Sequence, residues 1–348
     1  MNPTRIAVAG AGYIGQAHMG VVQRSPKCTL SAIVDPSPTA VSVADEAGVP
    51  LFSSIEDLLA KDRPDGLVLA TPNALHVSQA LRCIAAGLPI LLEKPIATTV
   101  ADGERLVNEV ERTGTKVLIG HHRAHSPIMA KAKEVVASGQ LGRLVSVMGS
   151  ATFFKPDIYF EETPWRRELG AGPILLNMIH EVHNLRMLCG EVTAVQAFKS
   201  HATRGLPVED TVAINLQFTS GVLGSFMLSD TAACPRSWEQ TSQENKAYPT
   251  YEDEDCYVLA GTNGSLSVPT MRLKTYPRVE DRSWWKPFEV GIVGMVREDP
   301  LKHQIEHFVA VIQGQAQPLV NAHDGLKNLK ITEAIAQAAT TRRTVTLI

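Results

Sequence analysis

The stretch Ile6-Ala7-Val8-Ala9-Gly10-Ala11-Gly12-Tyr13-Ile14-Gly15 stands close to the start of the chain and decides the fold of its first part. An apolar strand runs directly into glycines spaced as G-x-G-x-x-G. In that spacing the first glycine allows a tight turn, the second lets the backbone approach a pyrophosphate, and the third lets the next helix lie close to the strand. Asp35 closes the next apolar strand, 20 residues after Gly15, where a carboxylate can bind ribose hydroxyls. The stretch predicts a dinucleotide-binding turn with cofactor contacts from Gly10, Gly12, Tyr13, Ile14, Gly15 and Asp35.

The composition is that of a globular protein with two domains. The chain has 348 residues, of which 44% are hydrophobic, and a domain usually takes about 100–200 residues. A net charge of −3 without a basic cluster excludes the footprint of a nucleic-acid or anionic-membrane partner. Five cysteines without C-x-x-C spacing indicate reduced thiols, and no apolar run approaches the ~18 residues of a membrane span. We expect a cytoplasmic protein with a small-molecule substrate.

Helical and extended patterns alternate as far as about Gly120. Continuous apolar runs such as 66–70 are typical of parallel strands that are buried on both faces. Strictly alternating βα units predict a doubly wound Rossmann domain, assigned to residues 1–121. The predicted strands cover 66–70, 89–92 and 116–119, the predicted helices cover 39–47, 74–86 and 100–112, and Ser53-Ser54-Ile55-Glu56 forms a capping box that opens a further helix.

The pattern changes in residues 122–348, which we assign to a second α/β domain. Short β-rich segments with tight turns favour a large, open, mostly antiparallel sheet. Such a sheet exposes more apolar surface than its helices can cover, which predicts a homodimer or homotetramer formed through it. The β-rich segments are 143–154, 193–201, 212–218, 222–229, 257–260 and 265–268, the predicted helices are 128–137, 300–312 and 323–339, and 235–254 is a long polar loop.

Two strand ends carry the polar residues of greatest interest, because ligands of doubly wound sheets bind beyond the carboxyl ends of the strands. Thr71-Pro72-Asn73 and His76 follow the strand at 66–70 and could contact a ribose or nicotinamide. The alternative is an ordinary helix cap with a solvated histidine. Glu93-Lys94-Pro95 follows the strand at 89–92 and places a lysine at a buried strand end. Its alternative is a surface ion pair between Glu93 and Lys94.

Three further clusters are candidate substrate or metal sites. His121-His122-Arg123 follows the strand at 116–119, so His122 and Arg123 are candidate substrate contacts, with linker packing as the alternative. Trp165-Arg166-Arg167 offers a stacking surface and a guanidinium suited to a carboxylate, unless Trp165 packs in the core and the arginines are solvated. His303-Gln304-Ile305-Glu306-His307 matches an inverted zinc-protease signature in form, but the rest of that constellation is missing, which favours a polar helix face. No metal site is expected.

Taken together, these motifs resemble the glucose-fructose oxidoreductase, inositol dehydrogenase and MocA (Gfo/Idh/MocA) family. The resemblance rests on the glycine turn, Thr71-Pro72-Asn73 with His76, Glu93-Lys94-Pro95, and Gly170-Ala171-Gly172-Pro173 leading to His180, in this order over nearly the whole chain. It implies a Rossmann domain, a second domain whose open sheet often forms oligomers, and hydride transfer between a nicotinamide cofactor and a hydroxyl-bearing substrate. It also implies that Lys94 and His180 are catalytic.

General chemistry supports the same two residues. Alcohol oxidation requires a base for the hydroxyl proton and a cation beside the oxygen. His180 suits the base, since a histidine's usual pKa of ~6.5 is close to neutral pH, and Lys94 suits the cation, although the two roles could be exchanged. Many members of the family have aspartates four residues before and three residues after the histidine, where this chain has Leu176 and His183. Asn177 is the nearest polar substitute and shares a helix face with His180.

Substrate and cofactor are less narrowly defined. We expect NAD rather than NADP, because Asp35 repels a ribose phosphate and the following residues offer no arginine. A cyclic polyol, a sugar or a related compound with a secondary hydroxyl is the expected substrate, and a carboxylated sugar or cyclic dihydrodiol is the alternative. A catalytically silent protein that binds cofactor and a sugar-like ligand is the alternative of another class. The presence of both Lys94 and His180 favours the enzyme.

Overall fold

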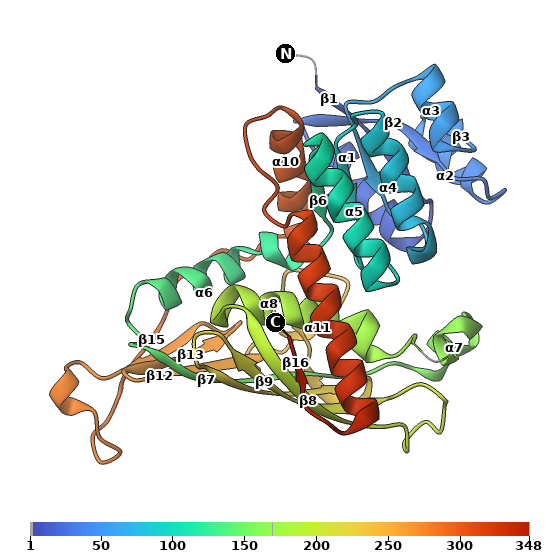
Figure 1. The fold of residues 1–348 in the computed structure, drawn as a ribbon. Helices are drawn as coiled ribbons and strands as arrows, with labels where there is room; N and C mark the ends of the chain where they lie inside the picture. The colour runs from blue at the N-terminus through green and yellow to red at the C-terminus, as the bar shows by residue number, and fades with distance from the viewer. Residues whose placement is uncertain (1–2, 169, 348) are drawn as a thin grey trace. The chain divides into compact units, whose positions relative to one another are not determined.

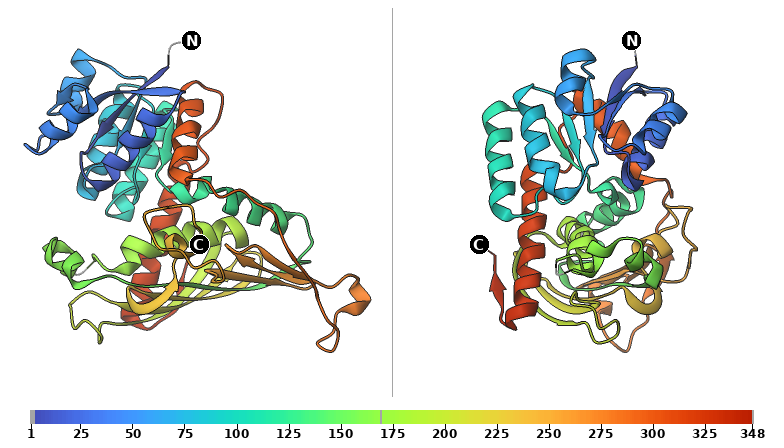
Figure 2. Two further views of the ribbon diagram at one scale, coloured as in Figure 1. Left: turned by 180° about the vertical axis from the view of Figure 1, so that it is seen from behind. Right: turned by 90° about the vertical axis from the view of Figure 1, so that its right-hand side faces the viewer.

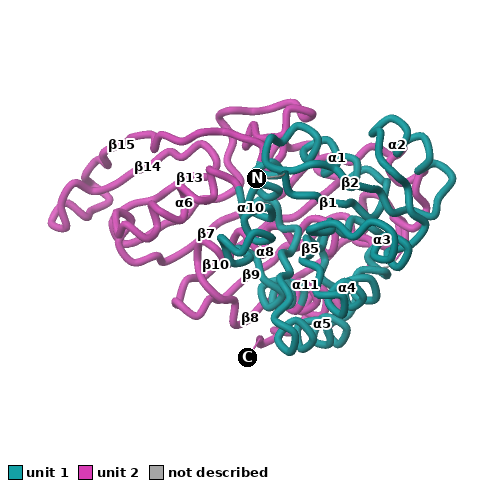
Figure 3. The backbone as a smooth tube through the Cα atoms, turned by 90° about the horizontal axis from the view of Figure 1, so that it is seen from above, with its two compact units in different colours: residues 1–125, 300–329 teal, residues 126–299, 330–348 magenta. Residues whose placement is uncertain are grey.

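The computed structural model describes residues 3–168 and 170–347. They form two compact units, residues 1–125 with 300–329 and residues 126–299 with 330–348 (Figure 3). The sequence pattern predicts a second domain that begins at residue 122, whereas the structure groups 300–329 with the first unit. Packing explains the difference. A Cβ at Gly66 would lie 2.5 Å from Cδ1 of Ile312, so the small size of this strand residue lets the helix at 300–312 pack closely on the sheet.

The first unit has a six-stranded parallel sheet in the order β3-β2-β1-β4-β5-β6, which confirms the doubly wound fold. Every residue of β4, β5 and β6 is buried, as the continuous apolar runs predicted. The strands are β1 (Thr4–Ala9), β2 (Cys28–Val34), β3 (Leu51–Phe52), β4 (Gly66–Leu69), β5 (Ile90–Leu92) and β6 (Val117–Ile119), and the helices are α1 (Tyr13–Arg24), α2 (Ala40–Ala47), α3 (Ile55–Lys61), α4 (His76–Ala85), α5 (Val100–Thr113) and α10 (Pro300–Ile312) (Figure 1).

The second unit is built on a ten-stranded sheet in the order β15-β14-β13-β12-β7-β10-β9-β8-β16, with β11 paired to β7. Its pairs are antiparallel except that of β7 with β10, which is parallel. The mostly antiparallel sheet predicted from the sequence is therefore confirmed. The strands are β7 (Leu144–Phe154), β8 (Val192–Ser200), β9 (Thr211–Phe218), β10 (Leu223–Ser229), β11 (Thr231–Arg236), β12 (Tyr257–Gly261), β13 (Gly264–Val268), β14 (Arg272–Thr275), β15 (Glu289–Ile292) and β16 (Val345–Thr346).

The two faces of this sheet differ. Helices α6 (Pro127–Ala137), α8 (Ile179–Cys189) and the later part of α11 (Ala322–Thr341) lie on one face (Figures 1 and 2). Along β9 and β10, buried residues beneath these helices alternate with exposed residues on the other face. That outer face carries large apolar side chains of high exposure, namely Met148 (62%), Phe198 (58%), Leu223 (61%) and Met227 (45%).

Several short elements were not predicted. The loop expected over 235–254 contains α9 (Trp238–Thr241) and the last residues of β11. A short helix, α7 (Asp157–Glu161), follows β7, and a single π-helical turn over Ile174–Met178 leads into α8. Elements of this length carry too few residues for a periodic pattern. Within the residues that the structure describes, no helix has both the length and the apolar character that a bilayer span requires.

Candidate active site

The glycine turn shows directly why its residues are glycines. Gly10 has φ +97°, and a side chain there would lie 2.4 Å from the carbonyl oxygen of Ala70. A side chain on Gly15 would lie 1.9 Å from the carbonyl oxygen of Gly10. Gly12 is different, because nothing lies within 4 Å of the position that a Cβ would take. Gly10 and Gly15 are therefore required by the fold of the turn, and Gly12 leaves open space at the N-terminus of α1, where a phosphate is favoured.

Asp35 ends β2 beside this turn and is fixed by backbone donors. Its Oδ2 accepts a hydrogen bond from the Ala11 amide at 2.8 Å, and its Oδ1 accepts one from the Ser37 amide at 2.8 Å. Burial opposes ionisation of this carboxyl group, but the bonds from Ser37 and Ala11 outweigh it and lower the pKa of Asp35. Asp35 is therefore a preformed anion that can accept a further hydrogen bond from a ligand hydroxyl.

A cavity of about 700 Å³ lies against the turn, entirely within the first unit. Gly10, Gly12, Asp35, Thr71 and Pro72 line it, which brings together five of the predicted cofactor residues. Four other lining residues, Ser53, Ser54, Gln79 and Arg82, were not predicted as contacts. The capping box could have pointed to two of them, since the Ser54 hydroxyl accepts from the Asp57 amide at 3.1 Å. The adjoining helix N-terminus, the open space at Gly12 and the carboxylate fit a dinucleotide.

His76 and Glu93 lie in the protein interior instead of on this cavity. His76 is fully buried, and its ring nitrogens lie 2.7 Å from the Pro95 carbonyl and 3.0 Å from the Thr71 carbonyl. Burial lowers the pKa of His76 despite these two acceptors. The histidine thus connects the segment after β4 to the segment after β5. Its place in the structure is that of a support for the strand ends, which the sequence pattern could not distinguish from a ligand contact.

Glu93 is held from helix α1 by a histidine that the sequence analysis did not single out. His18 is fully buried, and its Nε2 lies 2.8 Å from Glu93 Oε1. Burial raises the pKa of Glu93, but the hydrogen bond and the charge of His18 outweigh it, so the pKa is lowered overall. Glu93 Oε2 also accepts from the Lys94 amide at 3.2 Å. One buried pair therefore links the helix after the glycine turn to the backbone of Lys94.

The other candidate catalytic residues lie in the second unit. His180 is in the first turn of α8 and is 8% exposed. Asn177 lies in the π-helical turn just before α8, a type of turn that is frequent at functional sites. The Oδ1 atom of Asn177 accepts a hydrogen bond from Lys155 Nζ at 3.0 Å. The second unit thus adds a lysine that no motif marked.

Comparison with known proteins agrees with both halves of this description. Residues 4–121 match the model of an oxidoreductase family with an NAD-binding Rossmann fold, and residues 129–267 match the model of the Gfo/Idh/MocA C-terminal domain. The chain belongs to the Gfo/Idh/MocA oxidoreductase family. It is 25% identical over 346 residues to the rhizopine catabolism protein MocA of Rhizobium meliloti, covering 97% of this chain and 95% of that protein.

Two further similarities extend over most of this Gfo/Idh/MocA chain. An inositol 2-dehydrogenase of Rubrobacter xylanophilus is 26% identical over 351 residues, covering 94% of this chain and 89% of the relative. The crystal structure of the WlbA dehydrogenase from Bordetella pertussis, in complex with NADH and UDP-GlcNAcA, has a TM-score of 0.79 at 24% identity and covers 100% of this chain and 99% of that chain. The structural likeness shows the same fold.

The other predicted cofactor residues of this family member lie outside the cavity lining. Tyr13 is 82% exposed, Asn73 starts a short 3₁₀ turn, and Lys94 directly follows Glu93 at the end of β5. Ile14 is half-buried in the first turn of α1. The structure therefore divides the predicted set into residues that line the cavity and residues that build or flank its walls.

The predicted substrate residues of this oxidoreductase have mixed environments. His122 is half-buried and Arg123 is 4% exposed, both in the first unit. Trp165 is 49% exposed in the second unit. The Arg166 guanidinium lies 3.7 Å from the centre of the Tyr159 ring and donates to the Tyr159 carbonyl at 2.8 Å.

The histidines of the 303–307 segment have protein partners. His307 Nε2 accepts from the Leu319 amide at 3.0 Å, and the centre of its ring lies 5.1 Å from that of His125 with the two planes tilted by 48°. Glu306 accepts from Lys27 at 2.7 Å. Among the described residues no group of three His, Cys, Asp or Glu side chains could hold a metal ion.

Proposed function

We propose that the chain is an NAD-dependent dehydrogenase that oxidises a secondary hydroxyl of a small cyclic polyol, sugar or related compound. The observation that carries this proposal is the preformed Asp35 carboxylate beside open space at Gly12, within a chain of an oxidoreductase family. Support for the hydroxyl substrate comes from the inositol 2-dehydrogenase relative. The five cysteines are free thiols, four of them buried, which agrees with a reducing cytoplasm.

His180 is the proposed base and Lys94 the proposed cation at the reacting oxygen. A neutral imidazole removes the hydroxyl proton, and the lysine ammonium stabilises the alkoxide as it develops. The bound nicotinamide supplies the acceptor for hydride. His76 and the His18–Glu93 pair hold the strand ends that carry Lys94, and Lys155 holds Asn177 one turn before His180. The amide of Asn177 takes the role of orienting a substrate, since it has no charge with which to stabilise an imidazolium.

Cofactor preference follows from the charges at the cavity. The Asp35 anion accepts ribose hydroxyls and repels a ribose phosphate. Arg82 also lines the cavity, but its guanidinium is paired with Glu56. A phosphate would have to compete with that carboxylate, so NAD is the proposed cofactor.

A substrate screen tests the proposal. Purified protein is mixed with NAD and a panel of polyols, aldoses, sugar acids and cyclic diols, and the absorbance of NADH is followed. NADH formation with at least one compound, faster with NAD than with NADP, supports the proposal. Tight NADH binding without turnover on any of them would instead favour the silent regulatory protein.

We also propose that the chain forms a homodimer or homotetramer through the outer face of the large sheet. Met227 and Phe198 both flank Ala213 across the strand pairs, so their exposed side chains belong to one patch. Contiguous apolar patches of this kind usually mark interfaces. Light scattering at micromolar concentration should give a dimeric or tetrameric mass, and Phe198→Glu with Met227→Glu should lower it. A monomeric mass for the unmodified protein would refute this assembly.

A further inference from the structure

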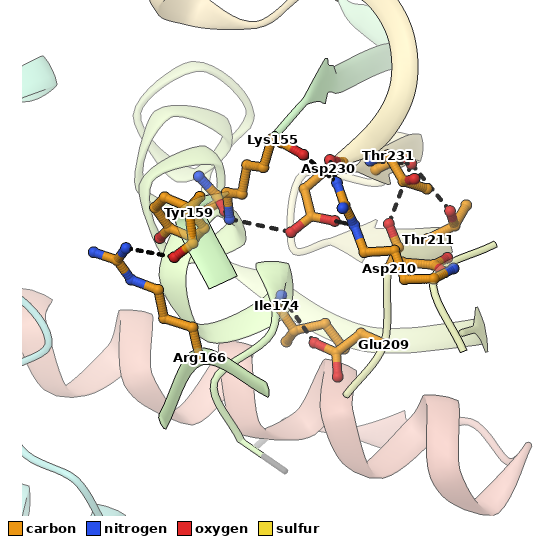
Figure 4. A network of polar contacts seen from close by, with 12 residues as sticks. Lys155, Tyr159, Arg166, Ile174, Glu209, Asp210, Thr211, Asp230 and Thr231 are labelled. Atoms are coloured by element: carbon orange, nitrogen blue, oxygen red, sulfur yellow. Dashed lines mark hydrogen bonds and ion pairs between the residues drawn. The ribbon is translucent and has the colours of Figure 1, made fainter. Parts of the chain in front are cut away.

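Lys155 lies on the helix-covered side of the large sheet, one residue beyond β7. Val147 and Ala151 of β7 are buried on that side, and the alternation of the strand carries Lys155 to it as well. The lysine side chain is only 12% exposed. Its Nζ lies 3.0 Å from Asn177 Oδ1 and 3.2 Å from Asp230 Oδ2 (Figure 4 shows the latter contact).

This contact determines which end of the Asn177 amide faces outward. A lysine ammonium has three donors and no acceptor, so only the oxygen of an amide can face it. The Nδ2 group of Asn177 therefore points the other way, and it makes no hydrogen bond within residues 3–168 and 170–347. Asn177 is thus presented as a hydrogen-bond donor. A donor at this point recognises an acceptor oxygen of a ligand.

The charges around Lys155 favour an anionic acceptor. Asp230 is the carboxylate in contact with the lysine. It also forms an ion pair with Arg204, whose Nε lies 3.6 Å from Oδ1 of Asp230. Arg166 adds a third cation, because its guanidinium and Lys155 Nζ lie 3.7 Å and 5.0 Å from the centre of the same Tyr159 ring (Figure 4).

Three other acids, Asp210 and Glu209 (Figure 4) and Asp157, lie near these cations. Asp210 is engaged by the amides of Thr203 and Arg204, and the side chain of Asp157, which pairs with Arg204, is 88% exposed. Burial raises the pKa of Glu209. Burial lowers the pKa of Lys155, an effect that the charge of Asp230 opposes, so the charge of the lysine is shared with Asp230. Arg166 makes no ion pair with a carboxylate of the described residues, and its positive charge stays beside Lys155.

We propose that Lys155 and Asn177 form a subsite that binds a carboxylate of the substrate. This inference rests on the proposed dehydrogenase function and narrows its substrate to a hydroxy acid such as a sugar acid. Asn177 donates one hydrogen bond to the carboxylate, and Lys155 fixes the amide and supplies the charge. Charge-assisted bonds to a carboxylate are the stronger kind, so this subsite sets specificity.

Matched pairs of substrates test the subsite. Turnover is measured with D-glucuronate against D-glucose and D-galacturonate against D-galactose, in the wild type, Lys155→Met and Lys155→Arg. The expected result is that the wild type prefers the acid of a pair, and that Lys155→Met lowers the acid-to-neutral ratio of kcat/KM roughly 10–100-fold. Lys155→Arg should restore most of the ratio, since it keeps charge and donors. Lys274→Met, which removes an exposed lysine from β14, is the control and should leave the ratio unchanged.

The outcomes separate this inference from the proposed function. A wild type that prefers neutral sugars, or a ratio unaffected by Lys155→Met, overturns the subsite and leaves the dehydrogenase in place. If no compound is turned over, the proposed function fails. Calorimetric titration with D-glucuronate then still tests the subsite, because the wild type should bind this acid and Lys155→Met should not. If Lys155→Met does not fold, Asn177→Asp provides the test instead. This variant keeps a partner for Lys155 but lacks the amide donor, so it should also lose binding of the acid. Retained binding would contradict the inference.

Discussion

The glycine turn of the first unit and the Lys155–Asn177 pair of the second unit differ in how far apart their residues lie in the sequence. Gly10, Gly12 and Gly15 lie within six positions, and two of them are required because neighbouring backbone atoms leave no space. Lys155, Asn177 and Asp230 come from three separate segments and meet through their side chains. A site built from local backbone geometry requires residues at a fixed spacing, which can be recognised in the sequence. A site built from distant side chains has no fixed spacing to recognise.

The turn itself offers the strongest test of this contrast. Gly10→Ala places a methyl group 2.4 Å from the Ala70 carbonyl at a φ of +97°, and should cost roughly 3 kcal/mol or more of unfolding free energy, with loss of NADH binding. Gly12→Ala meets no protein atom and should change stability by less than about 0.5 kcal/mol. It should still weaken NADH binding, because the methyl group takes space meant for a phosphate.

Chemical denaturation and NADH fluorescence titration measure the two effects separately. Equal losses of stability in both variants would show that the three glycines do not have distinct roles. Unchanged NADH affinity in Gly12→Ala would place the phosphates elsewhere.

Much of the fold was predicted from the sequence because its elements are long and periodic. The strands β1, β2, β4, β5 and β6 of the first sheet and helices α4, α5 and α6 occur close to the predicted positions, whereas the two-residue strand β3 was not predicted. The joining of 300–329 to the first unit was not predicted, since it depends on the fit of Ile312 against Gly66, which are far apart in the chain. Among the residues of the candidate site, Asp35 and Thr71 could be predicted because each stands at the end of a strand. His18 and Lys155 could not, because no sequence motif includes them.

The second prediction concerns the two catalytic candidates, one from each unit. His180→Asn should lower kcat roughly 10²–10⁴-fold, because proton removal is lost. Lys94→Met should also abolish most turnover. NADH affinity should be nearly unchanged in His180→Asn, because the substitution leaves every residue that lines the cofactor cavity in place.

The pH profile of His180→Asn decides between the roles. Loss of the limb that reports the base confirms His180 in that role, and retention of the wild-type limb assigns the base to Lys94. Near-normal rates in both variants would contradict the whole mechanism.

Asp35 tests whether a locally encoded residue can be changed without disturbing the fold around it. Asp35→Ser removes the anion but leaves a short polar side chain next to Ala11 and Ser37. The ratio of NADP to NAD dissociation constants should fall about tenfold, since repulsion of the phosphate is relieved. Direct titration with both cofactors measures the ratio, and Asp45→Ser on the exposed side of α2 is the control. A wild type with equal affinity for both cofactors would rule out the assigned role of Asp35.

The smallest expected effect belongs to the His18–Glu93 pair, a long-range contact in the otherwise locally encoded unit. The pKa of Glu93 is lowered in the folded state, so its ionised form adds stability above the pKa of an unfolded glutamate, ~4.3, and this contribution is lost as the pH falls through the folded value. Glu93→Gln keeps an acceptor for His18 but loses the charge, which should cost about 1 kcal/mol at pH 7. The difference between variant and wild type should shrink as the pH is lowered through the folded-state pKa of Glu93, because the wild-type carboxylate becomes protonated there. Urea denaturation across this pH range measures it, with Glu46→Gln on the exposed surface as the control. A difference that stays constant with pH would mean that the charge of Glu93 does not stabilise the fold, and that the pair acts only through shape and packing.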